Sequence, residues 1–247
     1  EAEAAEAALA ANRASLRLAP PGLPEMAFDP ARDLVFDFGP ALPGHANGMV
    51  LEALDAQGDV LLQEIYYSIG GGFVRSAAEM AAVDDAALNA ASPVPFAFRK
   101  AEEMLAMARA SGLSIAQMKQ RNERVFRKEA EIDAGLSRIW AVMEGCLNRG
   151  LGTEGILPGG LSVRRRAKGI HQALLAERDM NLVAPHTIND WVSAYAMAVN
   201  EENAAGGQVV TAPTNGAAGV VPAVIRYWLD HVPGAAPSRV GEFLLTA

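Results

Sequence analysis

The stretch richest in groups that could do chemistry runs from 198 to 219 and reads AVNEENAAGGQVVTAPTNGAAG. Its glycine pair, Gly206 and Gly207, should end one helix in the left-handed conformation. The segment 213–216 should then open a second, apolar helix, whose first-turn N–H groups are free and carry partial positive charge. Such a helix start can bind a carboxylate or a phosphate. Side-chain hydrogen bonds could come from Thr211, Thr214 and Asn215, and Gly216 would allow close approach. The alternative is an ordinary helix cap.

A second candidate is the run of three glycines in YYSIGGGFV, residues 66–74. Three adjacent glycines carry a high conformational entropy at the end of a strand. They are either a simple turn or a wall of backbone N–H groups around an anion. The candidate stretch runs from Tyr67 to Phe73.

Three arginines, Arg164, Arg165 and Arg166, follow the glycine-rich turn of EGILPGGLSV at a predicted helix start. The helix dipole disfavours cations there. The position therefore indicates an anionic partner for at least one arginine, which is either a bound carboxylate or a glutamate or aspartate of the protein.

Other chemistries find little support in the residue types. The histidines, which are His45, His171, His186 and His231, have no metal-binding spacing such as HExxH. No lysine has an evident pocket for pyridoxal phosphate, and no phosphate-binding or nucleophile-elbow motif is present. One cysteine, Cys146, excludes an intrachain disulfide framework and an all-cysteine metal site built from these residues alone.

The elements that must position these groups change in character along the chain. Residues 1–14 are alanine-rich and predict a helix. Residues 31–75 favour β-structure, with strands at 34–36, 49–54 and 60–67 and a hairpin turn at 55–59. A strand-like segment is also expected at 209–211.

From about residue 76 the apolar period becomes helical. One helix should begin at Pro95-Phe96 and end at Ser111-Gly112. A second should be capped by Ser114 with Gln117 and run to about 148, with a break near Gly135. Residues 150–163 should form a loop. Further helices are expected near 166–178, 189–205, 216–230 and 239–247.

Composition narrows the class of protein. The net charge of −8 argues against general nucleic-acid binding, because phosphate contacts need a basic surface. No apolar run reaches the roughly 20 residues that span a bilayer. The chain opens Glu1-Ala2-Glu3 without Met or a signal peptide, so a cytoplasmic location and a fragment or processed product are expected.

The fold class that follows is α+β, with a partial small α/β domain before a mostly helical domain. We place the first domain at 1–78, a linker at 79–94 and the helical domain at 95–247.

Taken together, the motifs resemble those of the bacterial iron–sulfur L-serine dehydratases of the single-chain type. The resemblance rests on YYSIGGGFV, PFAFRKAEEML, WAVMEGCLNRGL, EGILPGGLSVRRRA and, above all, AVNEENAAGGQVVTAPTNGAAGVVPAV. It covers the chain from about residue 24 onward.

The resemblance implies conversion of L-serine to pyruvate and ammonia. A [4Fe–4S] cluster, held by three cysteines, would act as Lewis acid on the β-hydroxyl while a base removes the α-proton. The substrate pocket would consist of Ser68, Gly70, Gly71, Gly72, Thr211, Thr214, Asn215 and Gly216. The supporting residues would be Asn200, Glu201, Asn203, Arg164, Arg165 and Arg166. The complete protein is expected to be a homodimer with neither nucleic-acid nor membrane partners.

Two departures from the family pattern matter. The cluster cysteines of the family lie beyond the TAPTNGAAG segment, in a region that these 247 residues lack, and Cys146 is not a cluster ligand by position. The family's Ser-His-Thr motif is also absent, and His45 belongs to a different motif. The sequence therefore predicts an internal fragment, inactive alone, with no metal ligands and an unidentified catalytic base. The alternatives are a non-catalytic module that binds a small carboxylate or amino acid, and an enzyme completed by a second chain.

Overall fold

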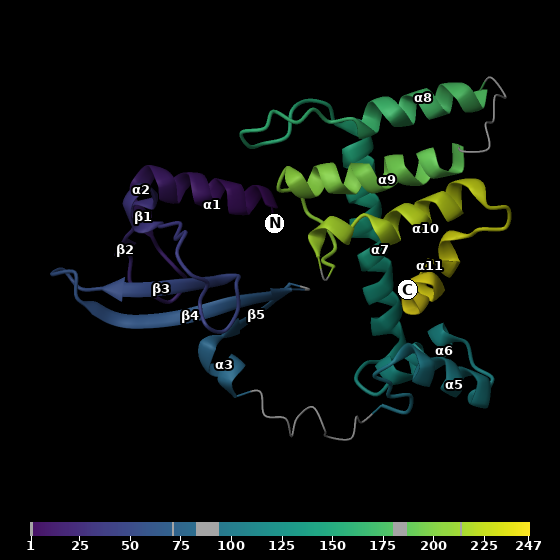
Figure 1. Cartoon of the computed structure of the whole chain (residues 1–247), viewed down its shortest axis with the longest axis horizontal. Helices are drawn as coiled ribbons and strands as arrows, with labels where there is room; N and C mark the ends of the chain where they lie inside the picture. The colour runs from purple at the N-terminus through teal and green to yellow at the C-terminus, as the bar shows by residue number, and fades with distance from the viewer. Residues whose placement is uncertain (1, 71, 83–93, 180–186, 213) are drawn as a thin grey trace.

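The computed structural model describes residues 2–70, 72–82, 94–179, 187–212 and 214–247. Figure 1 shows a strand-bearing N-terminal part and a larger helical part. This arrangement confirms the predicted α+β class. None of the helices in the described ranges is both long and apolar enough to cross a membrane.

The N-terminal part begins with the predicted helix, α1 (Ala2–Ser15), followed by the short antiparallel pair β1 (Arg17–Leu18) and β2 (Met26–Ala27). One helical turn, α2 (Pro30–Asp33), is capped by the side chain of Asp29. An antiparallel sheet then forms in the order β3 (Gly48–Leu54), β4 (Val60–Gly70) and β5 (Phe73–Ser76). It leads into α3 (Ala77–Ala81), which starts in a capping box formed by Ser76 and Glu79.

The hairpin turn between β3 and β4 is confirmed. One carboxylate oxygen of Asp55 accepts hydrogen bonds from the backbone N–H groups of Gln57 and Asp59, at 2.9 and 2.8 Å. Asp55 thus organises the turn through its own side chain. The strand predicted at 34–36 is wrong. These residues have no regular structure, and Val35 and Phe36 are 78% and 76% exposed, so no packing holds them extended.

The first helices of the helical part depart from the prediction at their starts. The helix α5 (Ala101–Ser111) begins six residues later than expected, because the backbone N–H and C=O of Phe96 are both bonded to the Asn122 side chain, at 2.9 and 2.8 Å. It ends, as predicted, at a left-handed Gly112. The capping box of Ser114 and Gln117 is also confirmed, at the start of α6 (Ile115–Glu123).

The predicted break near Gly135 is wrong, since Gly135 lies inside α7 (Glu129–Gly152). The chain breaks instead between residues 124 and 128. A new helix starts there because Glu131 accepts a hydrogen bond from the backbone N–H of Lys128 at 2.8 Å. The loop expected at 150–163 begins only after Gly152 and contains one bridge, between Ile156 and Arg164.

The remaining helices are α8 (Ala167–Asp179), α9 (Thr187–Ala204), α10 (Val220–His231) and α11 (Val240–Thr246), with 3-10 turns at Asn215–Ala217 and Pro237–Arg239. The helix expected from residue 216 therefore starts at Val220. Pro222 explains the delay: proline lacks an N–H and is tolerated only in the first turn. The segment 209–211 is not a strand.

The core of the helical part lies around α9, which packs against α7, α8 and α10 (Figure 1). Its centre is formed by side chains that are 0–1% exposed, among them the large Tyr195 together with Leu147, Ala194, Ala198 and Ala223. Two glycines allow the backbones to approach closely. A Cβ on Gly150 would lie 2.3 Å from the carbonyl oxygen of Ala198, and one on Gly219 would lie 2.7 Å from that of Ala196.

Candidate functional site

Gly70 and Gly72 lie at the tip of the hairpin between β4 and β5. Gly70 pairs with Phe73 across the hairpin, and Ser68 pairs with Val74. Gly70 and Gly72 have φ angles of 92° and 79°, a region that side chains with a Cβ rarely adopt. Ser68 is exposed, and its backbone N–H donates to the carbonyl oxygen of Asn47 at 2.9 Å. Gly71 lies outside the described residues.

The hairpin tip meets the segment that follows α9. A Cβ placed on Gly72 would lie 3.3 Å from Cγ2 and 3.5 Å from Oγ1 of Thr211. Two of the segments singled out from the sequence, far apart along the chain, are therefore in contact. Because Gly72 has no side chain, the hydroxyl of Thr211 and the backbone of the hairpin tip lie next to each other.

The rest of the 211–216 segment has a different form from the one predicted. Thr214 and Asn215 belong to a 3-10 turn, in which the carbonyl oxygen of Thr214 accepts from the N–H of Ala217 at 2.9 Å and that of Asn215 from Ala218 at 3.1 Å. The α-helical start expected here is thus wrong, since a 3-10 turn stands in its place and the α-helix begins only at Val220. Thr214, Asn215 and Gly216 are exposed, and Thr214 makes no side-chain cap.

The supporting residues at the end of α9 divide into a buried and an exposed set. Glu201 is 5% exposed, and its Oε1 accepts hydrogen bonds from the backbone N–H groups of Arg166 and Ala167, at 2.6 and 3.2 Å. It therefore caps the N-terminus of α8. Its second oxygen, Oε2, is buried and has no hydrogen-bond partner in the described part of the chain. Asn200 is exposed and Asn203 half-buried.

The arginine-rich segment finds its anionic partners within the protein. Arg165 forms an ion pair with Oε1 of Glu202 at 2.7 Å, and the two side chains are only 9% and 8% exposed. Arg164 and Arg166 are exposed. Glu201 places negative charge at the N-terminus of α8, and Glu202 neutralises Arg165. The anionic partner expected for one of the arginines is therefore, for Arg165, a glutamate of the protein itself.

Two residues of this cluster were missed by the sequence reasoning. Glu202 also binds Arg149 of α7, at 3.1 Å, so that it joins two arginines from different elements. Adjacent glutamates near the end of an apolar helix were the available signal for Glu202. No local pattern links Arg149 to Glu202, because the contact is between distant helices.

The described residues do not fit an iron–sulfur cluster. Cys146 is 1% exposed in the core of α7, and burial raises the pKa of its thiol. In the same described ranges, no group of three or more histidine, cysteine, aspartate or glutamate side chains could hold a metal ion.

His171 and His231 pack against Trp191, with ring centroids 5.5 and 4.6 Å away. His45 accepts a hydrogen bond from the N–H of Asn47, and His186 lies outside the described residues.

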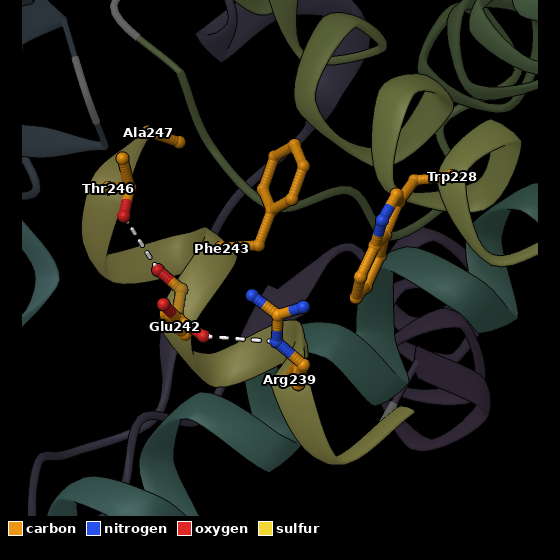
Figure 2. A pocket seen from close by; sticks show the side chains of 6 residues that line it. All are labelled: Trp228, Arg239, Glu242, Phe243, Thr246 and Ala247. Carbon is orange, nitrogen blue, oxygen red and sulfur yellow. Dashed lines mark hydrogen bonds and ion pairs between the residues drawn. The ribbon is translucent and has the colours of Figure 1, made fainter. Parts of the chain in front are cut away.

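A cavity of about 400 Å³ lies elsewhere, beside α11 (Figure 2). Its wall consists of Trp228, Arg239, Glu242, Phe243, Thr246 and Ala247. Figure 2 shows Arg239 between the aromatic side chains and Glu242, with which it forms an ion pair at 3.2 Å. None of the predicted site residues lines this cavity.

Comparison with known proteins places this architecture in a family of lyases. Residues 110–247 match the model of the serine dehydratase alpha chain, and residues 1–79 match that of the serine dehydratase beta chain. The chain therefore belongs to the serine dehydratase family.

Individual relatives agree. The chain is 47% identical to an L-serine dehydratase of Streptomyces coelicolor over 99% of this chain and 52% of the relative. It is 44% identical to L-serine dehydratase TdcG of Escherichia coli, over 81% of this chain and 43% of that protein, and 43% identical to an L-serine dehydratase of Mycobacterium tuberculosis, over 83% and 44%. The chain thus spans about half the length of the relatives it matches.

Proposed function

We propose that this chain is part of an L-serine ammonia-lyase, which converts L-serine to pyruvate and ammonia. The reaction removes the α-proton and the β-hydroxyl as water, and the resulting aminoacrylate is hydrolysed to pyruvate and ammonia. The observation that best supports the proposal is the contact between Gly72 and Thr211. It joins a segment matched by the beta-chain model to one matched by the alpha-chain model.

In this proposal the chain's own residues bind and orient the substrate. Backbone N–H groups of Gly70, Gly71 and Gly72 would receive the serine carboxylate, and the Thr211 hydroxyl would add a hydrogen bond. Flanking contacts would come from Ser68, Thr214, Asn215 and Gly216. Orienting the substrate in this way lowers the entropic part of the barrier.

We further propose that the complete enzyme uses a [4Fe–4S] cluster whose ligands lie outside these 247 residues. The burial of Cys146 supports a ligand set from elsewhere. The chain alone is then inactive. The same proposal includes the division into domains at 1–78 and 95–247 with a linker at 79–94, a homodimer and a cytoplasmic location.

The test is a pyruvate assay with L-serine on a complete protein of the relatives' length that contains this chain, after anaerobic reconstitution with iron and sulfide. We expect activity that is lost on exposure to air and restored by reconstitution. An activity that requires pyridoxal phosphate and survives iron removal would overturn the mechanism. Serine binding without turnover would favour the non-catalytic carboxylate-binding module.

A further inference from the structure

Glu202 is a buried carboxylate on which three separate segments converge. It is 6% exposed, and its two oxygens are bound by Arg165, which precedes α8, and by Arg149 of α7, at 2.7 and 3.1 Å. A buried carboxylate is unfavourable unless it is paired and hydrogen-bonded. Here both oxygens have guanidinium partners. The two ion pairs therefore connect α7 and the 153–166 segment to the end of α9.

Besides α7 and the 153–166 segment, the loop that follows α9 also contacts Glu202. The backbone N–H of Gly207 donates to the carbonyl oxygen of Glu202 at 2.8 Å, and Arg149 donates to the carbonyl oxygen of Gln208 at 3.1 Å. The loop passes so close that a Cβ on Gly207 would lie 3.0 Å from both the carbonyl oxygen and Oε2 of Glu202. The chain from 205 to 208 therefore lies against Glu202. One hydrogen bond joins it to Glu202 directly, and another joins it to Arg149, the ion-pair partner of Glu202.

Three residues after Gln208, Thr211 reaches the hairpin tip at Gly72. We propose that Glu202 is a positioning residue for this contact: with Arg149 and Arg165 it holds the loop that presents the Thr211 hydroxyl to Gly72. Glu202 acts through Thr211 and does not touch the substrate. The kinetic side of this inference rests on the proposed function, whereas its structural side does not.

The test is the substitution Glu202→Gln in the complete protein. Glutamine keeps the shape but loses the negative charge, so the nine-tenths buried Arg165 is left without its counter-ion. We expect amide exchange over residues 207–212 to accelerate about tenfold, and KM for L-serine to rise about tenfold with a smaller change in kcat, since charge-assisted hydrogen bonds are the strong ones. A fall in kcat with KM unchanged would overturn the positioning role.

The matched control is Glu144→Gln, which removes the same charge from α7. Glu144 is 44% exposed, and its ion-pair partner is Arg226 of α10, 3.8 Å away. This variant should leave both the exchange of 207–212 and KM unchanged. If Glu144→Gln and Glu202→Gln behave alike, the effect is one of net charge and the inference fails.

A second variant covers the case in which Glu202→Gln does not fold. Gly207→Ala keeps every charge but pushes a methyl group against the Glu202 carboxylate, so it should produce the same rise in KM and in local exchange. Gly169→Ala in α8, with open space around it, is its control. An unchanged KM in Gly207→Ala would contradict the inference.

The two proposals fail in distinguishable ways. If the unmodified protein shows no lyase activity but Glu202→Gln still accelerates exchange at 207–212, the proposed function falls and the positioning of the loop stands. If the unmodified protein is active and the variant changes neither exchange nor KM, the proposed function stands and the positioning role of Glu202 falls.

Discussion

At the scale of single residues, Glu201 and Glu202 resolve the electrostatic conflict posed by three arginines at a helix start. Glu201 accepts the free N–H groups of α8, while Glu202 neutralises Arg165. The sequence predicted that an anion must be present, because cations are disfavoured at a helix N-terminus. It did not predict which carboxylate supplies the charge, because that depends on how α8 and α9 pack.

Replacing Glu201 tests the helix cap. Glu201→Ala should lower the free energy of unfolding by about 1–2 kcal/mol, since it removes the acceptor of two backbone N–H groups. Glu201→Gln retains an acceptor oxygen and should cost less. Urea denaturation followed by circular dichroism measures both variants. Equal stability of Glu201→Ala and the unmodified chain would show that the cap contributes nothing.

Two half-buried histidines, His171 and His231, predict a pH dependence of stability. Burial lowers the pKa of both His171 and His231 below 6.5, aided by nearby Arg226 at His171 and by Arg178 at both, and opposed by Asp230. The unfolded chain therefore takes up protons first as the pH falls. The stabilisation is present above about pH 6.5 and is lost as the pH falls from there through the folded pKa values.

The urea concentration at the unfolding midpoint should therefore decrease as the pH is lowered from 7.5 to 5. The substitution His231→Phe keeps an aromatic ring against Trp191 and Tyr227 and removes one titrating group. It should flatten the decrease. A slope identical to that of the unmodified chain would mean that His231 does not contribute.

At the scale of helices and strands, local signals predicted some helix boundaries correctly. The cap formed by Ser114 and Gln117 and the end of α5 at Gly112 are confirmed. One error comes from a distant contact, because Asn122 holds the backbone of Phe96 outside a helix. Another error is local: the break after α6 was misplaced because Glu131 caps a new helix at Lys128, and Gly135 lies inside that helix.

The close packing of α7 on α9 gives a prediction for Gly150. The substitution Gly150→Ala places a methyl group against the backbone of Ala198, which cannot move aside without separating the helices. We expect a loss of about 1–3 kcal/mol of stability, typical of overpacking. Gly152→Ala, two residues further along α7, meets open space and serves as control. Comparable thermal midpoints for the two variants would contradict the packing argument.

At the scale of the whole molecule, the two parts differ in how much they bury. All seven residues of β3 are exposed, so neither face of the sheet is covered along this strand. In the described portion of the N-terminal part, Tyr67 is buried at 4% exposure and packs against Gly44 and Gly48. The helical part, by contrast, has a continuous core around α9.

The exposed apolar side chains predict that this chain on its own binds the dye ANS. Phe38 is 96% exposed and Leu61 is 70% exposed. Replacing both by serine should reduce the dye fluorescence without lowering the unfolding midpoint, because neither side chain contributes much to packing. Replacing Glu25 and Gln57, also exposed, by serine is the control. If the unmodified chain gives no ANS fluorescence, these apolar surfaces are covered and the prediction is wrong.

The contact between Gly72 and Thr211 also has a consequence for the order of events in folding. The hairpin and the helical core can each form from nearby residues, whereas their meeting requires a large loop to close. All three tryptophans, Trp140, Trp191 and Trp228, lie in the helical part. Recovery of tryptophan fluorescence during refolding therefore reports the helices alone, and formation of the contact between Gly72 and Thr211 should lag behind it.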